Sequence, residues 1–104
     1  MDALTRLEAT VTARLSADPS ESYVASLMAK GLPAIARKLG EEAVEAVVAA
    51  LSGSDEELVG EAADVLFHLT VLLAAKGVSF EQVMSELERR EGISGLDEKA
   101  SRSR

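Results

Sequence analysis

The segment "KLGEEAVEAVVAALSGSDEELVGEAAD", from Lys38 to Asp64, contains two stretches of helix-forming residues joined by a short polar turn. Alanine, leucine, valine and glutamate dominate both stretches, a mixture that is typical of α-helices. Within the turn, Ser54 is followed three residues later by Glu57, which is a capping-box pattern that begins a helix. Helices joined by so short a connection usually pack as antiparallel neighbours. The segment therefore predicts a helical hairpin.

Similar signals predict further helices on both sides of this hairpin. Asp18 and Pro19 resemble a helix start, Gly31 and Gly77 resemble helix ends, and Ser79 with Gln82 forms another capping box. The expected helices cover residues 2–15, 18–30, 33–51, 55–76 and 79–90. The tail, about 92–104, is rich in glycine, serine and charged residues, and we expect it to be irregular and partly mobile.

These elements predict an all-α fold, an antiparallel helical bundle of four to five helices that forms one domain over residues 1–104. The segment after Glu61 in the helix 55–76 is apolar on nearly every side. Such a helix must be covered all round, and a chain of 104 residues has little material to do so. We therefore expect a homodimer whose two-fold interface completes the core.

Composition excludes several classes of function. The formal net charge of −7 disfavours binding to nucleic acid, and the absence of cysteine excludes disulfides and thiolate metal sites. The N-terminus does not resemble a signal peptide. The longest apolar run, "VLFHLTVLLAA" at residues 65–75, is too short to span a bilayer. We expect a soluble, cytoplasmic protein with no membrane partner.

Acidic side chains recur at helical spacing on both helices of the hairpin, so that each set shares one face. The two sets are Lys38, Glu41, Glu42 and Glu45 on the first helix, and Glu61, Asp64 and His68 on the second. If the helices are rotated suitably, their carboxylates can converge on Mg²⁺, which prefers oxygen ligands and often bridges to phosphates. Acidic pairs at this spacing also occur on solvated faces. The residues alone leave both interpretations open.

The other charged residues also have two interpretations. His68 can be a satisfied core histidine, or it can hydrogen-bond the Asp64 carboxylate and contact a substrate. Lys38 can form a simple ion pair within its helix or contact a phosphate. Lys99 and Arg102, in the tail, can bind phosphate or merely increase solubility.

Two sequence motifs carry a resemblance to a known family. "EEAVE" (41–45) followed by "EAAD" (61–64) resembles the EExxE…ExxD signature of the MazG-like all-α nucleoside triphosphate pyrophosphohydrolases. With "KLGEEAVE", "FHL" and "GLDEKASR", the chain from Leu4 to Arg102 is similar to the phosphoribosyl-ATP pyrophosphatase family of histidine biosynthesis. The resemblance implies Mg²⁺-dependent hydrolysis of 1-(5-phosphoribosyl)-ATP, a nucleotide substrate, to 1-(5-phosphoribosyl)-AMP and pyrophosphate.

The resemblance also implies roles for individual residues. The metal ligands would be Glu42, Glu45, Glu61 and Asp64, the catalytic residues Glu41 and Glu45, and the substrate-binding residues Lys38, His68, Lys99 and Arg102. Glu41 would be an extra ligand or the base that orients water. Two alternatives stay open: a house-cleaning pyrophosphohydrolase for other (deoxy)nucleoside triphosphates, and a non-catalytic helical dimerisation module.

Overall fold

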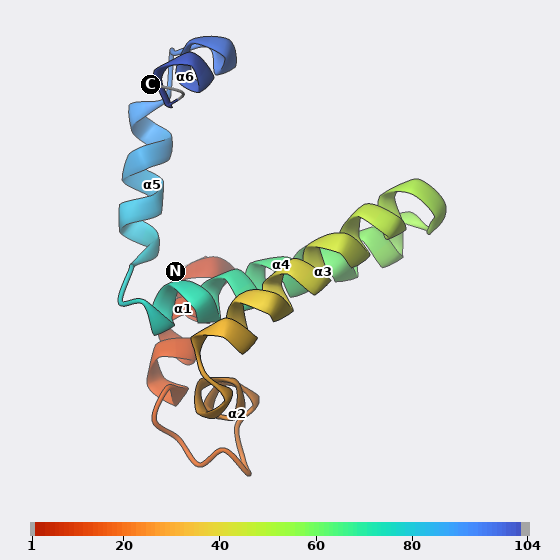
Figure 1. Cartoon of the computed structure of the whole chain (residues 1–104), viewed down its shortest axis with the longest axis vertical. Coiled ribbons are helices and arrows are strands. Elements are labelled where there is room, and N and C mark those ends of the chain that lie inside the picture. The colour runs from red at the N-terminus through yellow and green to blue at the C-terminus, as the bar shows by residue number, and fades with distance from the viewer. Residues whose placement is uncertain (1, 103–104) are drawn as a thin grey trace.

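Six α-helices make up the regular structure of residues 2–102, the part of the chain that the computed structural model describes (Figure 1). They are α1 (Ala3–Arg14), α2 (Tyr23–Lys30), α3 (Leu32–Ser52), α4 (Asp55–Ala75), α5 (Phe80–Arg89) and α6 (Gly95–Arg102). No strand occurs within this range, so the prediction of an all-α fold is confirmed.

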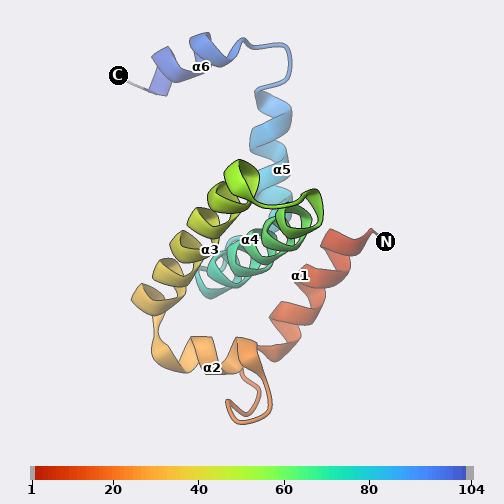
Figure 2. The ribbon, with the colours of Figure 1, turned by 90° about the vertical axis from the view of Figure 1, so that its right-hand side faces the viewer.

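Helices α3 and α4 form the predicted antiparallel hairpin and lie side by side along their length (Figures 1 and 2). The capping box at the start of α4 is confirmed: the Ser54 hydroxyl accepts from the Glu57 amide at 3.1 Å, and Glu57 accepts from the Ser54 amide. The turn is tight at Gly53, where a Cβ atom would lie 3.0 Å from the carbonyl oxygen of Ala49. This position therefore favours glycine.

The start of α2 differs from the prediction. Asp18 does not begin a helix: its side chain accepts from the amide and hydroxyl of Ser20, and its carbonyl accepts from the amides of Glu21 and Ser22. These bonds close a single turn, and the extended backbone of Ser22 then separates that turn from the helix. Ser22 is the true N-cap, accepting from the Ala25 amide at 3.2 Å.

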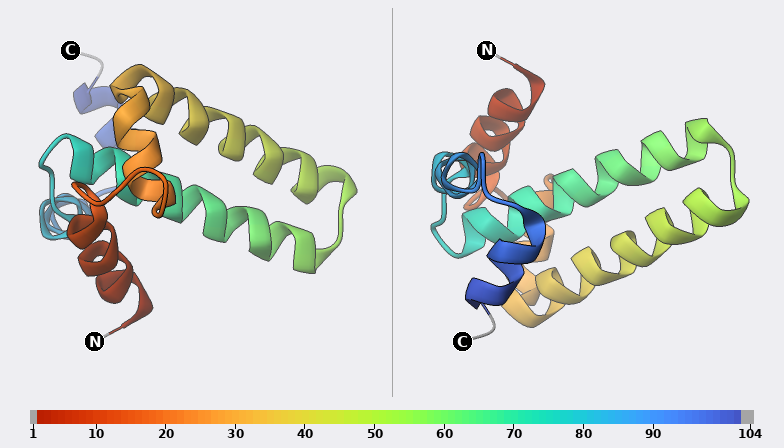
Figure 3. Two further views of the ribbon diagram at one scale, coloured as in Figure 1. Left: turned by 90° about the horizontal axis from the view of Figure 1, so that it is seen from below. Right: turned by 90° about the horizontal axis from the view of Figure 1, so that it is seen from above.

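The buried core lies where the first four helices meet, at one end of the hairpin (Figure 3). Its centre consists of Val11, Val24, Leu27, Ile35 and Val71. The other end of the hairpin extends beyond this core. Large apolar side chains of the hairpin are exposed, and we call them the apolar stripe. The exposed members of α3 are Val44, Val47, Val48 and Leu51, and those of α4 are Val59 and Leu66.

Helices α5 and α6 extend away from the hairpin as an arm (Figure 1). The start of α5 is anchored to α1, because a carboxylate oxygen of Glu8 accepts from the Phe80 amide at 2.7 Å. The described part of the tail is not irregular as predicted, since α6 covers Gly95–Arg102. Ser94 accepts from the Asp97 amide at 3.0 Å, and Lys99 and Arg102 lie in the last turn, where cations favour a helix. Residues 103 and 104 lie outside the described range.

Helix α4 is long and apolar enough to cross a membrane, judged by length and composition alone. The helix has 21 residues and is therefore longer than the apolar run 65–75, which by itself is too short to span a bilayer. Only 17% of its apolar stretch is buried in the single chain. The same helix begins with Asp55, Glu56 and Glu57, and packs against α3 and α1 at the centre of the fold. Its exposed apolar side chains are therefore a surface of a folded domain.

Candidate metal centre

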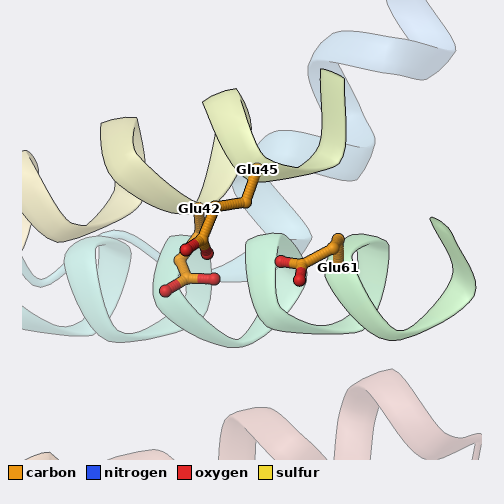
Figure 4. Close-up of side chains that lie close together, drawn as sticks. All are labelled: Glu42, Glu45 and Glu61. Atoms are coloured by element: carbon orange, nitrogen blue, oxygen red, sulfur yellow. The ribbon is translucent and has the colours of Figure 1, made fainter. Parts of the chain in front are cut away.

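Three glutamates gather between the two helices of the hairpin (Figure 4). Glu42 and Glu45 come from α3 and Glu61 comes from α4, and one carboxylate oxygen of each lies within 4.8 Å of the other two. Oxygens that share a Mg²⁺ octahedron lie within about 4 Å of one another, so a small side-chain adjustment would fit this group to the ion. We call these three residues the acidic cluster.

The pKa values of Glu42 and Glu45 in the acidic cluster are shifted in opposite directions. Burial acts to raise the pKa of Glu42, but the hydrogen bonds from Lys38 and Glu45 outweigh it, and the pKa lies below its ordinary value. Its hydrogen bond with Glu42 raises the pKa of Glu45, and the negative charges of Glu42 and Glu61 act in the same direction. The two carboxyl groups therefore hold one proton between them more readily than two isolated glutamates would.

The Glu61 side chain provides an independent sign that a ligand belongs here. Its Oε2 atom is buried and has no hydrogen-bond partner in the described part of the chain. A buried acceptor without a partner is costly, and a cation would satisfy it. The donor set, three carboxylates with one exposed edge at Glu45, suits a hard ion that keeps water and binds phosphate oxygens.

Asp64, the fourth predicted ligand, lies one turn beyond Glu61 on α4 with an exposed side chain. Its carboxylate is not among the three that approach within 4.8 Å of one another. Its backbone carbonyl instead lies 2.8 Å from Nδ1 of His68. The predicted hydrogen bond from His68 to the Asp64 carboxylate is therefore replaced by one to the Asp64 backbone.

The two hydrogen bonds of His68 define its tautomer. A carbonyl can only accept, so Nδ1 carries a proton, and in the neutral ring Nε2 accepts from the Tyr23 hydroxyl at 3.0 Å. His68 is 6% exposed, with Phe67 and Tyr23 against its ring. It links α2 to α4 and, in this arrangement, has no nitrogen left to bind a metal.

The remaining predicted residues divide into near and distant ones. Lys38 lies beside the cluster, with Nζ 3.1 Å from Glu42 and 3.9 Å from Glu41. Glu41 is half-exposed and lies outside the group of three. Lys99 and Arg102 lie on α6, which the arm carries away from the hairpin of the same chain (Figure 1).

Sequence reasoning did not identify Tyr23 as a neighbour of the site. The residue lies 45 positions before His68, and nothing local in the sequence indicates their contact. Arg37 could have been noticed in the sequence, because it directly precedes the predicted substrate-binding residue Lys38 on α3. Whether Tyr23 and Arg37 lie on one surface depends on how α2 is rotated relative to α3, which no short motif specifies.

Comparison with known proteins agrees with this arrangement. Residues 4–91 match the family described as phosphoribosyl-ATP pyrophosphohydrolase. A phosphoribosyl-ATP pyrophosphatase of Erythrobacter litoralis is 69% identical over 102 residues, covering 98% of each chain. One from Rhizorhabdus wittichii is 64% identical over 99 residues, covering 95% of this chain and 93% of the relative. The match covers both helices of the acidic cluster, and the chain therefore belongs to the phosphoribosyl-ATP pyrophosphohydrolase family.

Proposed function

We propose that the chain hydrolyses 1-(5-phosphoribosyl)-ATP to 1-(5-phosphoribosyl)-AMP and pyrophosphate with Mg²⁺, the second step of histidine biosynthesis. The observation that carries the proposal is the convergence of Glu42, Glu45 and Glu61 from two helices, with a buried unpartnered oxygen among them. Membership of the family supports the substrate and the reaction. A bound Mg²⁺ would neutralise phosphate oxygens and make water a better nucleophile.

The side chains of this chain would divide the work as follows. Glu42, Glu45 and Glu61 would hold the cation, and Asp64, one turn beyond Glu61 on α4, would be the fourth ligand. Glu45 or the neighbouring Glu41 would accept the proton of the attacking water. Water adds to one phosphorus of the α–β anhydride as the bond to the bridging oxygen breaks. Lys38 would contact the phosphate oxygens, and His68 holds the Tyr23 hydroxyl by a hydrogen bond.

Family membership decides against the two alternative functions, the house-cleaning pyrophosphohydrolase and the non-catalytic dimerisation module. Pyrophosphate release with Mg²⁺ should be measured on phosphoribosyl-ATP and on a panel of nucleoside triphosphates. We expect turnover of phosphoribosyl-ATP far above that of the panel. Similar rates for all substrates would contradict the specific reaction, and absence of any turnover would contradict hydrolysis.

We further propose a homodimer, with the exposed apolar stripe of α3 and α4 as its interface. Leu51 is 83% exposed and Val59 is 69% exposed, which is unfavourable in water for neighbouring large side chains. A second hairpin packed on this stripe would also cover the exposed face of α4. In such a dimer α6, which carries Lys99 and Arg102 and extends away from the hairpin of its own chain, can approach the partner's acidic cluster.

The interface is tested by the change Leu51→Glu, compared with Ala13→Glu on the exposed face of α1. Light scattering should give twice the 11.0 kDa chain mass for the wild type and for Ala13→Glu, and a lower mass for Leu51→Glu. A monomeric wild type would refute the dimer.

We also propose that the enzyme is cytoplasmic and that residues 1–104 form a single domain. The core shared by α1 to α4 supports the single domain. Cell fractionation tests the location, and limited proteolysis tests the domain.

A further inference from the structure

A pocket separate from the acidic cluster lies between α2 and the first half of α3. Its volume is about 340 Å³. It is lined by Tyr23, Leu27 and Lys30 from α2, and by Ala34, Arg37, Lys38 and Glu41 from α3. We call it the cationic pocket, because three of these seven side chains are positively charged and one is negative.

The charge of this pocket is unusual for a chain with a net charge of −7. Lys30 and Arg37 are exposed, and neither forms an ion pair within residues 2–102. Glu41 is held by Lys38 at the pocket edge, with 3.9 Å between Nζ and the carboxylate. The guanidinium of Arg37 and the ammonium of Lys30 are therefore available to an anion.

The walls of the pocket are held in place from behind. Leu27 and Ile35 are 3% and 2% exposed and belong to the central core, so they fix α2 against α3. Gly31 makes the sharp connection between the two helices with φ of 96°, which favours glycine. The Tyr23 hydroxyl is bonded to His68 at 3.0 Å, which ties the pocket to the helix that carries Glu61.

The cationic pocket and the acidic cluster adjoin each other along α3. Lys38 lines the pocket and also contacts Glu42 of the cluster at 3.1 Å. The rise of an α-helix places Arg37 roughly 12 Å from Glu45 along the axis. A ligand that carries phosphate at both ends could therefore contact the two sites together.

We propose that the cationic pocket binds the ribosyl 5-phosphate of the substrate, with Arg37 and Lys30 as its ligands, and so selects phosphoribosyl-ATP over nucleoside triphosphates. This assignment rests on the proposed function, which supplies a substrate with a phosphate group remote from its triphosphate. The acidic cluster repels a phosphate that no cation bridges, so the remote group needs cationic side chains of its own. A guanidinium can hold two phosphate oxygens at once, which suits Arg37 to this role.

The kinetic test uses Arg37→Gln and Lys30→Gln, with Arg14→Gln on α1 as the matched loss of an exposed charge. For phosphoribosyl-ATP, we expect KM to rise by about tenfold or more in each pocket variant, because a charge-assisted contact is lost. The value of kcat should change little, and Arg37→Lys should recover part of the affinity. Arg14→Gln should behave as the wild type.

A binding test separates the pocket from catalysis. Titration with ribose 5-phosphate, followed by NMR of the backbone amides, should shift signals around Tyr23, Lys30 and Arg37 in the wild type and not in Arg37→Gln. Ribose without phosphate should give no such shifts. Turnover by the wild type with unchanged KM in both pocket variants, or shifts confined to other regions, would overturn this assignment alone. Absence of turnover by the wild type would overturn the proposed function and this assignment with it.

Discussion

The two halves of helix α3 carry opposite charges and depend on different partners. In the first half, Arg37 and Lys38 face Lys30 of α2 across the cationic pocket. In the second half, Glu42 and Glu45 face Glu61 of α4 in the acidic cluster. One ion pair, between Lys38 and Glu42, joins the two halves. A single helix can therefore hold a cation site and an anion site, provided that each neighbouring helix supplies charge of the matching sign.

Neutralising the acidic half should have the largest effect on activity. We expect Glu45→Gln to lower turnover of phosphoribosyl-ATP by about a thousandfold, because the residue is a proposed metal ligand and one of the two proposed proton acceptors. Helix content measured by circular dichroism should not change, since Glu45 is exposed. Glu88→Gln on α5 is the matched control and should keep wild-type activity. Wild-type turnover by Glu45→Gln would remove the acidic cluster from the mechanism.

Removing the metal should distinguish the two halves thermodynamically. Saturation of the acidic cluster stabilises the fold by about 2.7 kcal/mol at a free Mg²⁺ concentration of about 100 times Kd. Thermal unfolding with Mg²⁺ and with EDTA should show this difference for the wild type. Glu61→Gln should lose most of the response, whereas Arg37→Gln should keep it. An equal response in all three proteins would mean that Mg²⁺ binds elsewhere.

The raised pKa of Glu45 predicts how Mg²⁺ affinity depends on pH. Below that pKa a proton competes with the cation, so the affinity should rise with pH by up to about tenfold per unit and level off above it. In the metal-free protein, stability should depend on pH in the opposite direction from the Mg²⁺ affinity. Any stability that comes from protonated Glu45 is present below its ordinary pKa and is lost as pH rises through the raised value. Calorimetric titration of Mg²⁺ at several pH values measures the first effect, and Glu45→Gln should flatten it.

A smaller effect is expected from Tyr23 in the wall of the cationic pocket. Tyr23→Phe removes the hydroxyl that donates to His68 and should cost about 1 kcal/mol of the free energy of unfolding, measured with urea. Tyr23→Phe should leave the response to Mg²⁺ intact. Ser26→Ala on the same helix removes a hydroxyl bonded only within α2 and serves as the comparison. If Tyr23→Phe abolishes the Mg²⁺ response, the two halves of α3 are not independent.

Local patterns were enough to predict most of the helices and the shared faces. Ser54 with Glu57 and Ser79 with Gln82 begin helices as expected, because each capping box satisfies its own backbone groups. Gly77, with φ of 70°, ends α4 as expected, and the Val78 amide bonds back to the Leu73 carbonyl. The prediction that Glu42, Glu45 and Glu61 could converge depended on helical spacing and on the two-residue turn, both of which are local.

The differences from the prediction come from competing local hydrogen bonds and from long-range packing. Asp18 has the composition of an N-cap, but hydrogen bonds to Ser20 favour an isolated turn. The segment that forms α6 is glycine-rich, and its cap at Ser94 and its terminal cations outweigh that composition. The contact between Tyr23 and His68 requires α2 to lie across the hairpin, which depends on burial of Leu27 and Ile35 rather than on any motif.

The bond between Glu8 and the Phe80 amide has a mechanical consequence. It joins the first helix to the base of the arm, and α5 is about 15 Å long, so a tilt of roughly 10° at Phe80 moves its far end by roughly 3 Å. The arm therefore pivots at the base of α5, where the Glu8 carboxylate and the buried Phe80 side chain join it to the rest of the fold. A tilt at this junction also moves α6. The positions of Lys99 and Arg102 therefore depend on Glu8, a residue of α1.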